Sequence, residues 1–216
     1  MKLIILAALL AISSHAGVFT LTGVDGSRGA NVTVNENGTP FAGFAGVLNG
    51  TYDGVSVGPL FCVDLFTDIN YGSYNAIPTG PDVNRQEDRA AWLYLNRLST
   101  VNSTDSGLAL QLAIWDIVHD NGDGFSTGLV LWGPSSITGL TQAQIDIANG
   151  YLADSFGQSA NTGISIYHNF DQTTGAPVQT LMGAAAPVPE TRTMLLTAAG
   201  VCTILAKVKE KRPACS

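Results

Sequence analysis

Residues 103–119, STDSGLALQLAIWDIVH, decide the predicted fold, because they form a helical pattern in a chain otherwise rich in short β runs. Apolar side chains recur at helical spacing, and Ser103-Thr104-Asp105 supplies residues that cap helix N-termini. The glycine-rich sequence Asp120-Asn-Gly-Asp-Gly124 breaks the pattern. A helix is therefore predicted to run to about His119, with its apolar face formed by Leu108, Leu112, Trp115 and Val118.

Two further helices are predicted beside it, over Arg85–Leu98 and over Thr141–Phe156, with Thr141 as the cap of the second. Asn37-Gly38 and Asn49-Gly50 are typical hairpin-turn dipeptides. The pattern predicts an α+β fold, a β domain that carries a helical subdomain of about three helices. The predicted strands are Val18–Thr22, Ala30–Val34, Phe41–Val47, Val55–Leu65, Gly163–Tyr167 and Val178–Met182.

Composition limits the class of protein. The chain has 216 residues, enough for one medium domain with appendages. Charged residues make up 12% and hydrophobic residues 45%, a balance that excludes a mostly disordered chain. The net charge of −7 argues against nucleic-acid binding, which needs clustered lysine and arginine.

Both ends carry sorting features. Residues 1–16 form a predicted secretory signal peptide, with Lys2, an apolar run over 3–12 and a small-residue site ending at Ala16. Residues 184–192 form a linker containing Pro189-Glu190, residues 193–206 a short uncharged apolar segment, and residues 207–216 a basic tail. This order predicts a membrane segment with a cytoplasmic basic flank.

The C-terminal region resembles the PEP-CTERM sorting signal of Gram-negative bacteria, in which a Pro-Glu-Pro motif, an apolar helix and a basic end follow one another. Here the motif reads Val188-Pro189-Glu190-Thr191, without the second proline. The resemblance implies membrane anchoring until an exosortase removes the tail, and a final location at the cell surface or outside the cell. A simple C-terminal anchor is the alternative.

The predicted ectodomain, residues 17–183, has an unusual set of reactive side chains. It contains four arginines, 15 acidic residues and no lysine, which gives a net charge of −11. Cys62 is its only cysteine. Exported proteins normally pair their cysteines, so a single one is an inert buried thiol, a nucleophile, or part of another covalent bond.

Gln111 is the candidate partner of Cys62, because it lies on the apolar face of the central helix. A buried amide without partners costs roughly 2–7 kcal/mol. Either a loop satisfies this amide, or the Cys62 sulfur has attacked its carbonyl and released ammonia, leaving an internal thioester. Proximity in the fold would drive that reaction, and an apolar wall would keep water away. The candidate wall residues are Phe61, Leu112 and Trp115.

The motifs Phe61-Cys62-Val63-Asp64 and Leu110-Gln111-Leu-Ala-Ile-Trp115 resemble those of the thioester domain family of bacterial surface adhesins. The resemblance covers about residues 55–170 and implies that Cys62 and Gln111 are bond partners. It also implies a β-sandwich or barrel-like fold with a helical subdomain. It implies adhesion through covalent capture of an amine-bearing, lysine-containing partner. The absence of lysine from the ectodomain fits such a stored electrophile. The protein would be a single-use binder rather than an enzyme, and no cofactor is expected.

Three alternatives stay open from the sequence. A cysteine hydrolase would need His119 or His168 near Cys62, with Asp116 or Asp171 to orient it. A structural surface or matrix protein would hold an inert Cys62. Calcium binding is a separate idea for the acidic segment Asp116, Asp120, Asn121 and Asp123, but the spacing lacks the final glutamate of an EF-hand and no metal site is predicted.

Overall fold

The computed structural model describes residues 16–36, 39–133 and 136–185. The predicted signal peptide apart from Ala16, the apolar segment 193–206 and the basic tail 207–216 lie outside these residues, as do Asn37-Gly38 and most of the linker. Among the helices of the described part, none is both long and apolar enough to cross a membrane.

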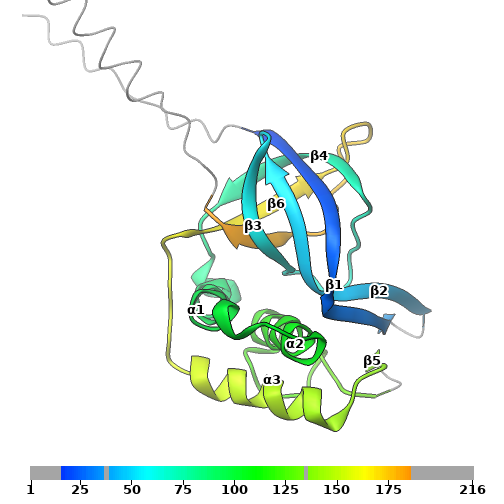
Figure 1. The fold of residues 1–216 in the computed structure, drawn as a ribbon, viewed down its shortest axis with the longest axis vertical. Helices are drawn as coiled ribbons and strands as arrows, with labels where there is room; N and C mark the ends of the chain where they lie inside the picture. Colours follow the sequence, from blue (N-terminus) through cyan, green and yellow to red (C-terminus); the bar gives the residue numbers. More distant parts are fainter. Residues whose placement is uncertain (1–15, 37–38, 134–135, 186–216) are drawn as a thin grey trace, which may run out of the picture. The chain divides into compact units, whose positions relative to one another are not determined.

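The described chain has the predicted α+β architecture, and its strands form a barrel (Figure 1). The strand order is β2-β3-β7-β6-β4-β1, and β1 pairs again with β2, so the ring closes through antiparallel pairs. Closure leaves no free sheet edge in that ring. The strands are β1 (Gly17–Glu36), β2 (Thr39–Tyr52), β3 (Val55–Cys62), β4 (Gly72–Thr79), β5 (Ile137–Thr138), β6 (Ile164–Phe170) and β7 (Leu181–Ala184).

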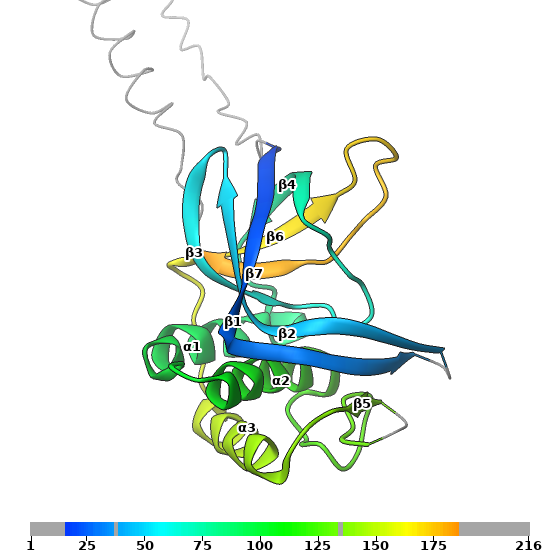
Figure 2. The ribbon, with the colours of Figure 1, turned by 45° about the vertical axis from the view of Figure 1, so that its right-hand side comes forward.

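The β1–β2 hairpin extends beyond the barrel. Its register shifts between Val24 and Gly29, where β1 bulges, and bulges of this kind bend and twist a strand pair. Beyond the bulge the two strands leave the barrel as a ribbon that passes over α2 (Figure 2). β5 then pairs with β1 at Thr33 and Val34. The segments predicted as separate strands over 18–22 and 30–34 are therefore two parts of one strand.

The prediction of a turn at Asn49-Gly50 is wrong. These residues lie within β2, where the pairing with both neighbouring strands shifts register. The hairpin turn between β2 and β3 is instead Asp53-Gly54, with φ angles of 49° and 78°. Positive φ at both central residues is the requirement of a type I′ turn, which Asp-Gly meets well.

The helices of the described residues all lie between β4 and β6 in the chain. Ser103 begins α2 with a capping box that it shares with Ser106, and Thr141 begins α3 with one that it shares with Gln144. The predicted helix starts at these two caps are thereby confirmed. The helices are α1 (Glu87–Arg97), α2 (Thr104–Asp120) and α3 (Gln142–Ser155), with short 3₁₀ helices η1 (Val83–Arg85) and η2 (Leu98–Thr100) on either side of α1.

The central helix α2 forms the middle of the domain. It packs against β1, β2 and β3 on one side and against α1 and α3 on the other (Figure 1). Every residue from Ser106 to Ile117 is buried, as expected for a helix with neighbours all round. The helix that carries Gln111 is thus held from all sides.

Gly107 lets α2 approach β1 closely. A Cβ atom at this position would lie 2.0 Å from the backbone oxygen of Arg28, and backbone cannot move aside as a side-chain tip can. We expect Gly107→Ala to lower the free energy of unfolding by about 1–3 kcal/mol, the usual range for overpacking, despite alanine's better helix propensity. Urea denaturation would measure this. Gly150→Ala, in α3 with open space around its Cβ, is the matched control, and equal stability of the two variants would contradict the close approach.

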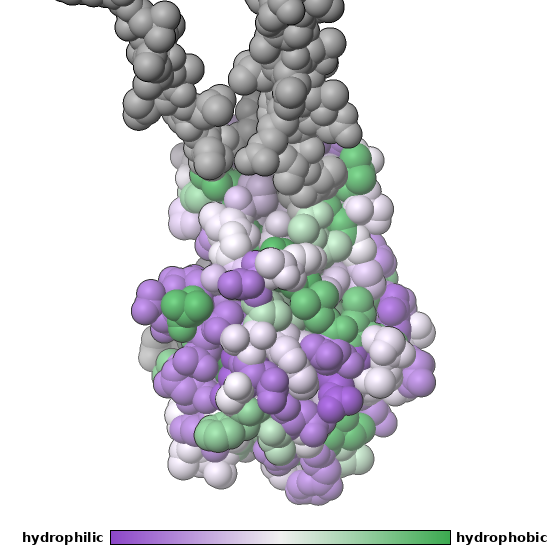
Figure 3. Space-filling model, turned by 90° about the vertical axis from the view of Figure 1, so that its left-hand side faces the viewer, coloured by the Kyte–Doolittle hydropathy of each residue, from purple (hydrophilic) through white to green (hydrophobic). Residues whose placement is uncertain are grey.

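Hydrophobic side chains on the outer surface are dispersed. On the face drawn in Figure 3 they lie in separate small groups among hydrophilic residues. Phe156 is the most exposed large one of the described chain, at 79%, and the Arg89 guanidinium lies 5.9 Å from the centre of its ring.

Candidate functional site

Cys62 and Gln111 lie in contact at the junction of the barrel and α2. Cys62 is the last residue of β3, and Gln111 is fully buried in the middle of α2. The backbone N–H of Cys62 donates to Oε1 of Gln111 at 2.9 Å, and Nε2 of Gln111 donates to the backbone oxygen of Cys62 at 2.7 Å. The amide of Gln111 is therefore held by both backbone groups of the one residue that carries the thiol.

Two more side chains of α2 form hydrogen bonds with the backbone that follows Cys62. Trp115 follows Gln111 by four residues, and its Nε1 donates to the backbone oxygen of Asp64 at 3.1 Å. His119 follows by four more, and its Nε2 accepts from the backbone N–H of Leu65 at 3.1 Å. Residues four apart share one helix face, so a single face of α2 fixes the backbone from Cys62 to Leu65. This role was not predicted from the sequence, although the spacing of four residues between Gln111, Trp115 and His119 was its visible signal.

Polar contacts of Asp64 with residues outside α2 also hold this segment in place. Its Oδ2 accepts from the backbone N–H of Thr180 at 3.0 Å, and its Oδ1 lies 3.4 Å from Nη2 of Arg85. The side chain of Gln179 donates to its backbone oxygen. Polar contacts therefore hold the residues after β3 against α2, against the two residues that precede β7, and against η1. These contacts restrict the position of Cys62.

The thiol of Cys62 is shielded. Cys62 is 5% exposed and forms no disulfide. Burial, together with the nearby Asp64 carboxylate, raises the pKa of its thiol to about 12. At neutral pH the sulfur is thus protonated and a weak nucleophile, so any reaction here depends on position rather than on an activated thiolate.

A pocket of about 240 Å³ connects Cys62 with the surface. Its volume is below the roughly 300–1,000 Å³ of sites for drug-sized ligands, which suits one extended side chain. Strands β1 and β2 provide most of the apolar wall, and the loop after β3 provides polar groups. The lining includes Leu21, Val24, Val32, Val34, Phe44, Leu48, Cys62, Asp68, Asn70, Tyr71, Trp115 and Gln179.

Of the three predicted wall residues, Trp115 lines the pocket, whereas Phe61 and Leu112 are fully buried and do not line it. Successive residues of a strand point to opposite faces, so Phe61 points away from Cys62 and its ring meets that of Tyr94 edge-on at 6.1 Å. The ribbon residues that take their place could not be placed near Cys62 from sequence spacing.

The histidines do not form the arrangement of a cysteine hydrolase. Among the described residues, neither His119 nor His168 has a hydrogen bond to the Cys62 thiol. His119 is half-buried and bonded to Leu65 rather than a surface or capping residue, and burial lowers its pKa. His168 bonds Oγ1 of Thr79 at 3.0 Å, and Asp171 accepts only from its own turn. The nucleophile–base–acid relay that such chemistry needs is not assembled around Cys62.

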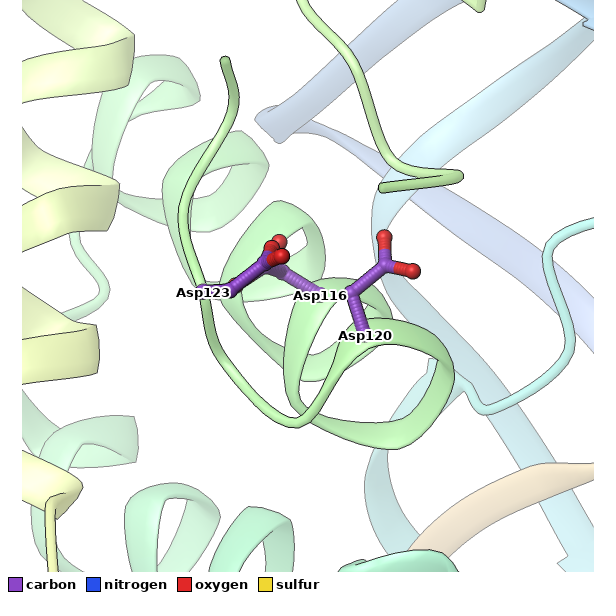
Figure 4. Close-up of side chains that lie close together, drawn as sticks. All are labelled: Asp116, Asp120 and Asp123. Carbon is purple, nitrogen blue, oxygen red and sulfur yellow. The ribbon is translucent and has the colours of Figure 1, made fainter. Parts of the chain in front are cut away.

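The residues that could hold a metal ion lie at the end of α2. Asp116, Asp120 and Asp123 bring one oxygen each to within 4.8 Å of one another (Figure 4). Asn121, which the sequence grouped with them, ends the helix in the left-handed conformation, and its backbone oxygen accepts from Arg89.

Comparison with known proteins shows no family but does show distant structural likeness. No family model matches the chain, and no curated protein matches it either. The N-terminal domain of the Streptococcus pyogenes pilus tip adhesin Cpa has 13% sequence identity and a TM-score of 0.42, in a match that covers 81% of this chain and 100% of that chain. Membership of the thioester domain family stays a prediction from the Cys62 and Gln111 motifs.

Proposed function

We propose that this chain is an exported surface or matrix protein whose domain holds a Cys62–Gln111 thioester and uses it to capture an amine-bearing partner covalently. The observation that carries the proposal is the pair of hydrogen bonds, 2.9 and 2.7 Å, between the Gln111 amide and the backbone of Cys62. They join two residues 49 positions apart, the two that the motifs had singled out.

Formation of the bond needs no external reagent. The Cys62 sulfur bonds to the Gln111 side-chain carbonyl carbon, the bond from that carbon to Nε2 breaks, and the thiol proton leaves with the nitrogen as ammonia. The Cys62 N–H already donates to Oε1, where negative charge develops in the tetrahedral intermediate, and such placed donors stabilise that charge. The high thiol pKa favours a slow, single maturation step over repeated turnover.

In the capture reaction the Cys62 thiol, which was the nucleophile when the bond formed, becomes the leaving group. An amine nitrogen bonds to the Gln111 carbonyl carbon, the carbon–sulfur bond breaks, and an amine proton passes to the Cys62 sulfur. The pocket supports a route for this amine, because Cys62 lines it together with Asp68 and Asn70 of the loop after β3. The net charge of −11 over residues 17–183 attracts cationic side chains. Without lysine in that range, self-reaction with a lysine of the domain is avoided.

The alternative is a structural surface protein with an inert Cys62. It is favoured by the same hydrogen bonds, because they satisfy the amide of Gln111 fully without a covalent bond. The two functions differ in what happens when an amine is added.

Incubating the purified protein with a biotinylated primary amine separates them. We expect covalent labelling of native protein, mapped by peptide sequencing to Gln111, with one new thiol at Cys62. Cys62→Ala, which keeps both backbone hydrogen bonds, is expected to remain unlabelled. A matched control, Gln144→Ala, changes a buried glutamine of α3 and is expected to label normally. An unlabelled wild type with an alkylatable Cys62 after denaturation would establish the structural alternative.

A further inference from the structure

The three carboxylates at the end of α2 are electrostatically unfavourable as they stand. Asp116 and Asp120 lie four residues apart on the helix, and Asp123 lies in the turn that follows. Like charges at this spacing repel, and the C-terminus of a helix already carries a partial negative charge. Figure 4 shows the Asp116 and Asp123 carboxylates side by side, with that of Asp120 on the adjoining turn.

No basic side chain forms an ion pair with them within the described part of the chain. Arg89 attracts the Asp116 carboxylate electrostatically, but each of its three nitrogens donates a hydrogen bond elsewhere. Nε donates to Oγ of Ser155 at 3.1 Å, Nη1 to the backbone oxygen of Asn121 at 2.8 Å, and Nη2 to that of Leu152 at 2.9 Å. Arg89 thus holds the helix ends together and makes no ion pair with the three aspartates.

The buried member of the group has an unsatisfied oxygen. Asp116 is 0% exposed, and its Oδ2 accepts from the backbone N–H of Gly124 at 3.1 Å. Its Oδ1 is buried without a hydrogen-bond partner. Leaving a buried carboxyl oxygen unpaired is expensive. Burial and the neighbouring Asp123 disfavour the ionised form and raise the pKa of Asp116 to about 7. A bound cation would satisfy the oxygen and offset the repulsion together.

The other two carboxylates are already held in place by one oxygen each. Oδ2 of Asp120 accepts from the backbone N–H groups of Leu129 and Val130 at 2.8 and 2.6 Å. Oδ2 of Asp123 accepts from Oγ1 of Thr127 at 3.0 Å. In all three aspartates these bonds engage Oδ2 and leave Oδ1 for another ligand.

We propose that Asp116, Asp120 and Asp123 bind a calcium ion that completes the C-terminal end of α2. A set of oxygens without nitrogen or sulfur favours a hard cation. Ca²⁺ lies about 2.3–2.6 Å from its ligands, so oxygens on opposite sides of it are up to about 5 Å apart. The spread of at most 4.8 Å fits that span. Water and backbone oxygens would complete the six to eight ligands that are usual for calcium.

This site is separate from the proposed thioester, although both depend on α2. Gln111 lies in the middle of the helix, and the carboxylates lie over its last turn and the following loop. Either proposal can therefore fail without the other.

The test is a calcium titration of the purified protein after chelator treatment, at a pH above 7. We expect one binding site by calorimetry, with a Kd below about 1 mM. At 100 times the Kd, the midpoint of thermal unfolding is expected to rise by about 5–10 °C. Asp123→Asn keeps the shape of an exposed residue and is expected to weaken binding at least tenfold. Asp146→Asn, an exposed aspartate of α3, is the matched control and is expected to bind normally.

A second variant keeps the test valid if Asp123→Asn fails to fold. Asp116→Asn removes the buried ionisable carboxyl group, so we expect its stability without calcium to equal or exceed that of the wild type. We expect its calcium response to disappear. The proposal is overturned by a wild type that shows neither heat nor a shifted midpoint with calcium. It is equally overturned by an unchanged response in Asp123→Asn, or by an equal response to Mg²⁺.

Discussion

Opening the Cys62–Gln111 bond with methylamine is expected to lower the midpoint of thermal unfolding by roughly 8–16 °C. The bond would join residues 49 positions apart, and in the chain-entropy model a cross-link over such a loop stabilises the folded state by about 4 kcal/mol. For a domain of this size each kcal/mol shifts the midpoint by about 2–4 °C. Differential scanning calorimetry before and after treatment measures the shift directly.

Cys62→Ala is the control for this result. It cannot form the cross-link, so its midpoint is expected to lie close to that of the methylamine-treated wild type and not to change with methylamine. If the wild type and Cys62→Ala melt within a few degrees of each other and neither responds, the cross-link is absent, because a lost buried sulfur alone costs only about 1 kcal/mol.

Gln111→Ala is expected to be less stable than Cys62→Ala by about 2–6 kcal/mol. Both variants lack the cross-link, but Cys62→Ala keeps both hydrogen bonds of Gln111, since these go to the backbone of residue 62. Removing the Gln111 amide leaves a buried N–H and a buried carbonyl unpaired, and each costs about 1–3 kcal/mol. Urea denaturation of the two variants gives the difference.

Two further variants sharpen this comparison. Gln111→Glu keeps an oxygen that can accept from the Cys62 N–H, so its stability is expected to lie between those of Cys62→Ala and Gln111→Ala. The double variant Cys62→Ala/Gln111→Ala is expected to be about as stable as Gln111→Ala, because the cross-link is lost only once. Fully additive losses would show that the two side chains act independently in the wild type.

The helices could be read from the sequence because their signals are local. Ser103 and Thr141 begin the two capping boxes that start α2 and α3, and apolar spacing marked the buried face of α2. The strands were harder. Asn49-Gly50 has the composition of a turn but forms an irregularity within β2, because pairing on both sides outweighs local preference. β4 has no strong alternation and was missed.

The candidate site likewise contains some residues that could be predicted from the local sequence and others that could not. Cys62 stood out as the only cysteine of its region and Gln111 as an amide on an apolar face, and the structure places the two in contact. The roles of Trp115 and His119 depend on the backbone after β3 lying along α2, which no local pattern encodes. The unpaired oxygen of Asp116 likewise follows from packing of the whole helical subdomain around it.

The most direct test of the account is the intact mass of the purified protein beside that of Cys62→Ala. We expect the wild type to be lighter than its sequence mass by one ammonia. After methylamine treatment we expect its mass to exceed the sequence mass by one methylamine less one ammonia. Cys62→Ala is predicted to have its full sequence mass and to be unaffected by methylamine. A wild type at its full sequence mass, with Cys62 alkylated after denaturation, would contradict the thioester and leave a buried, inert cysteine.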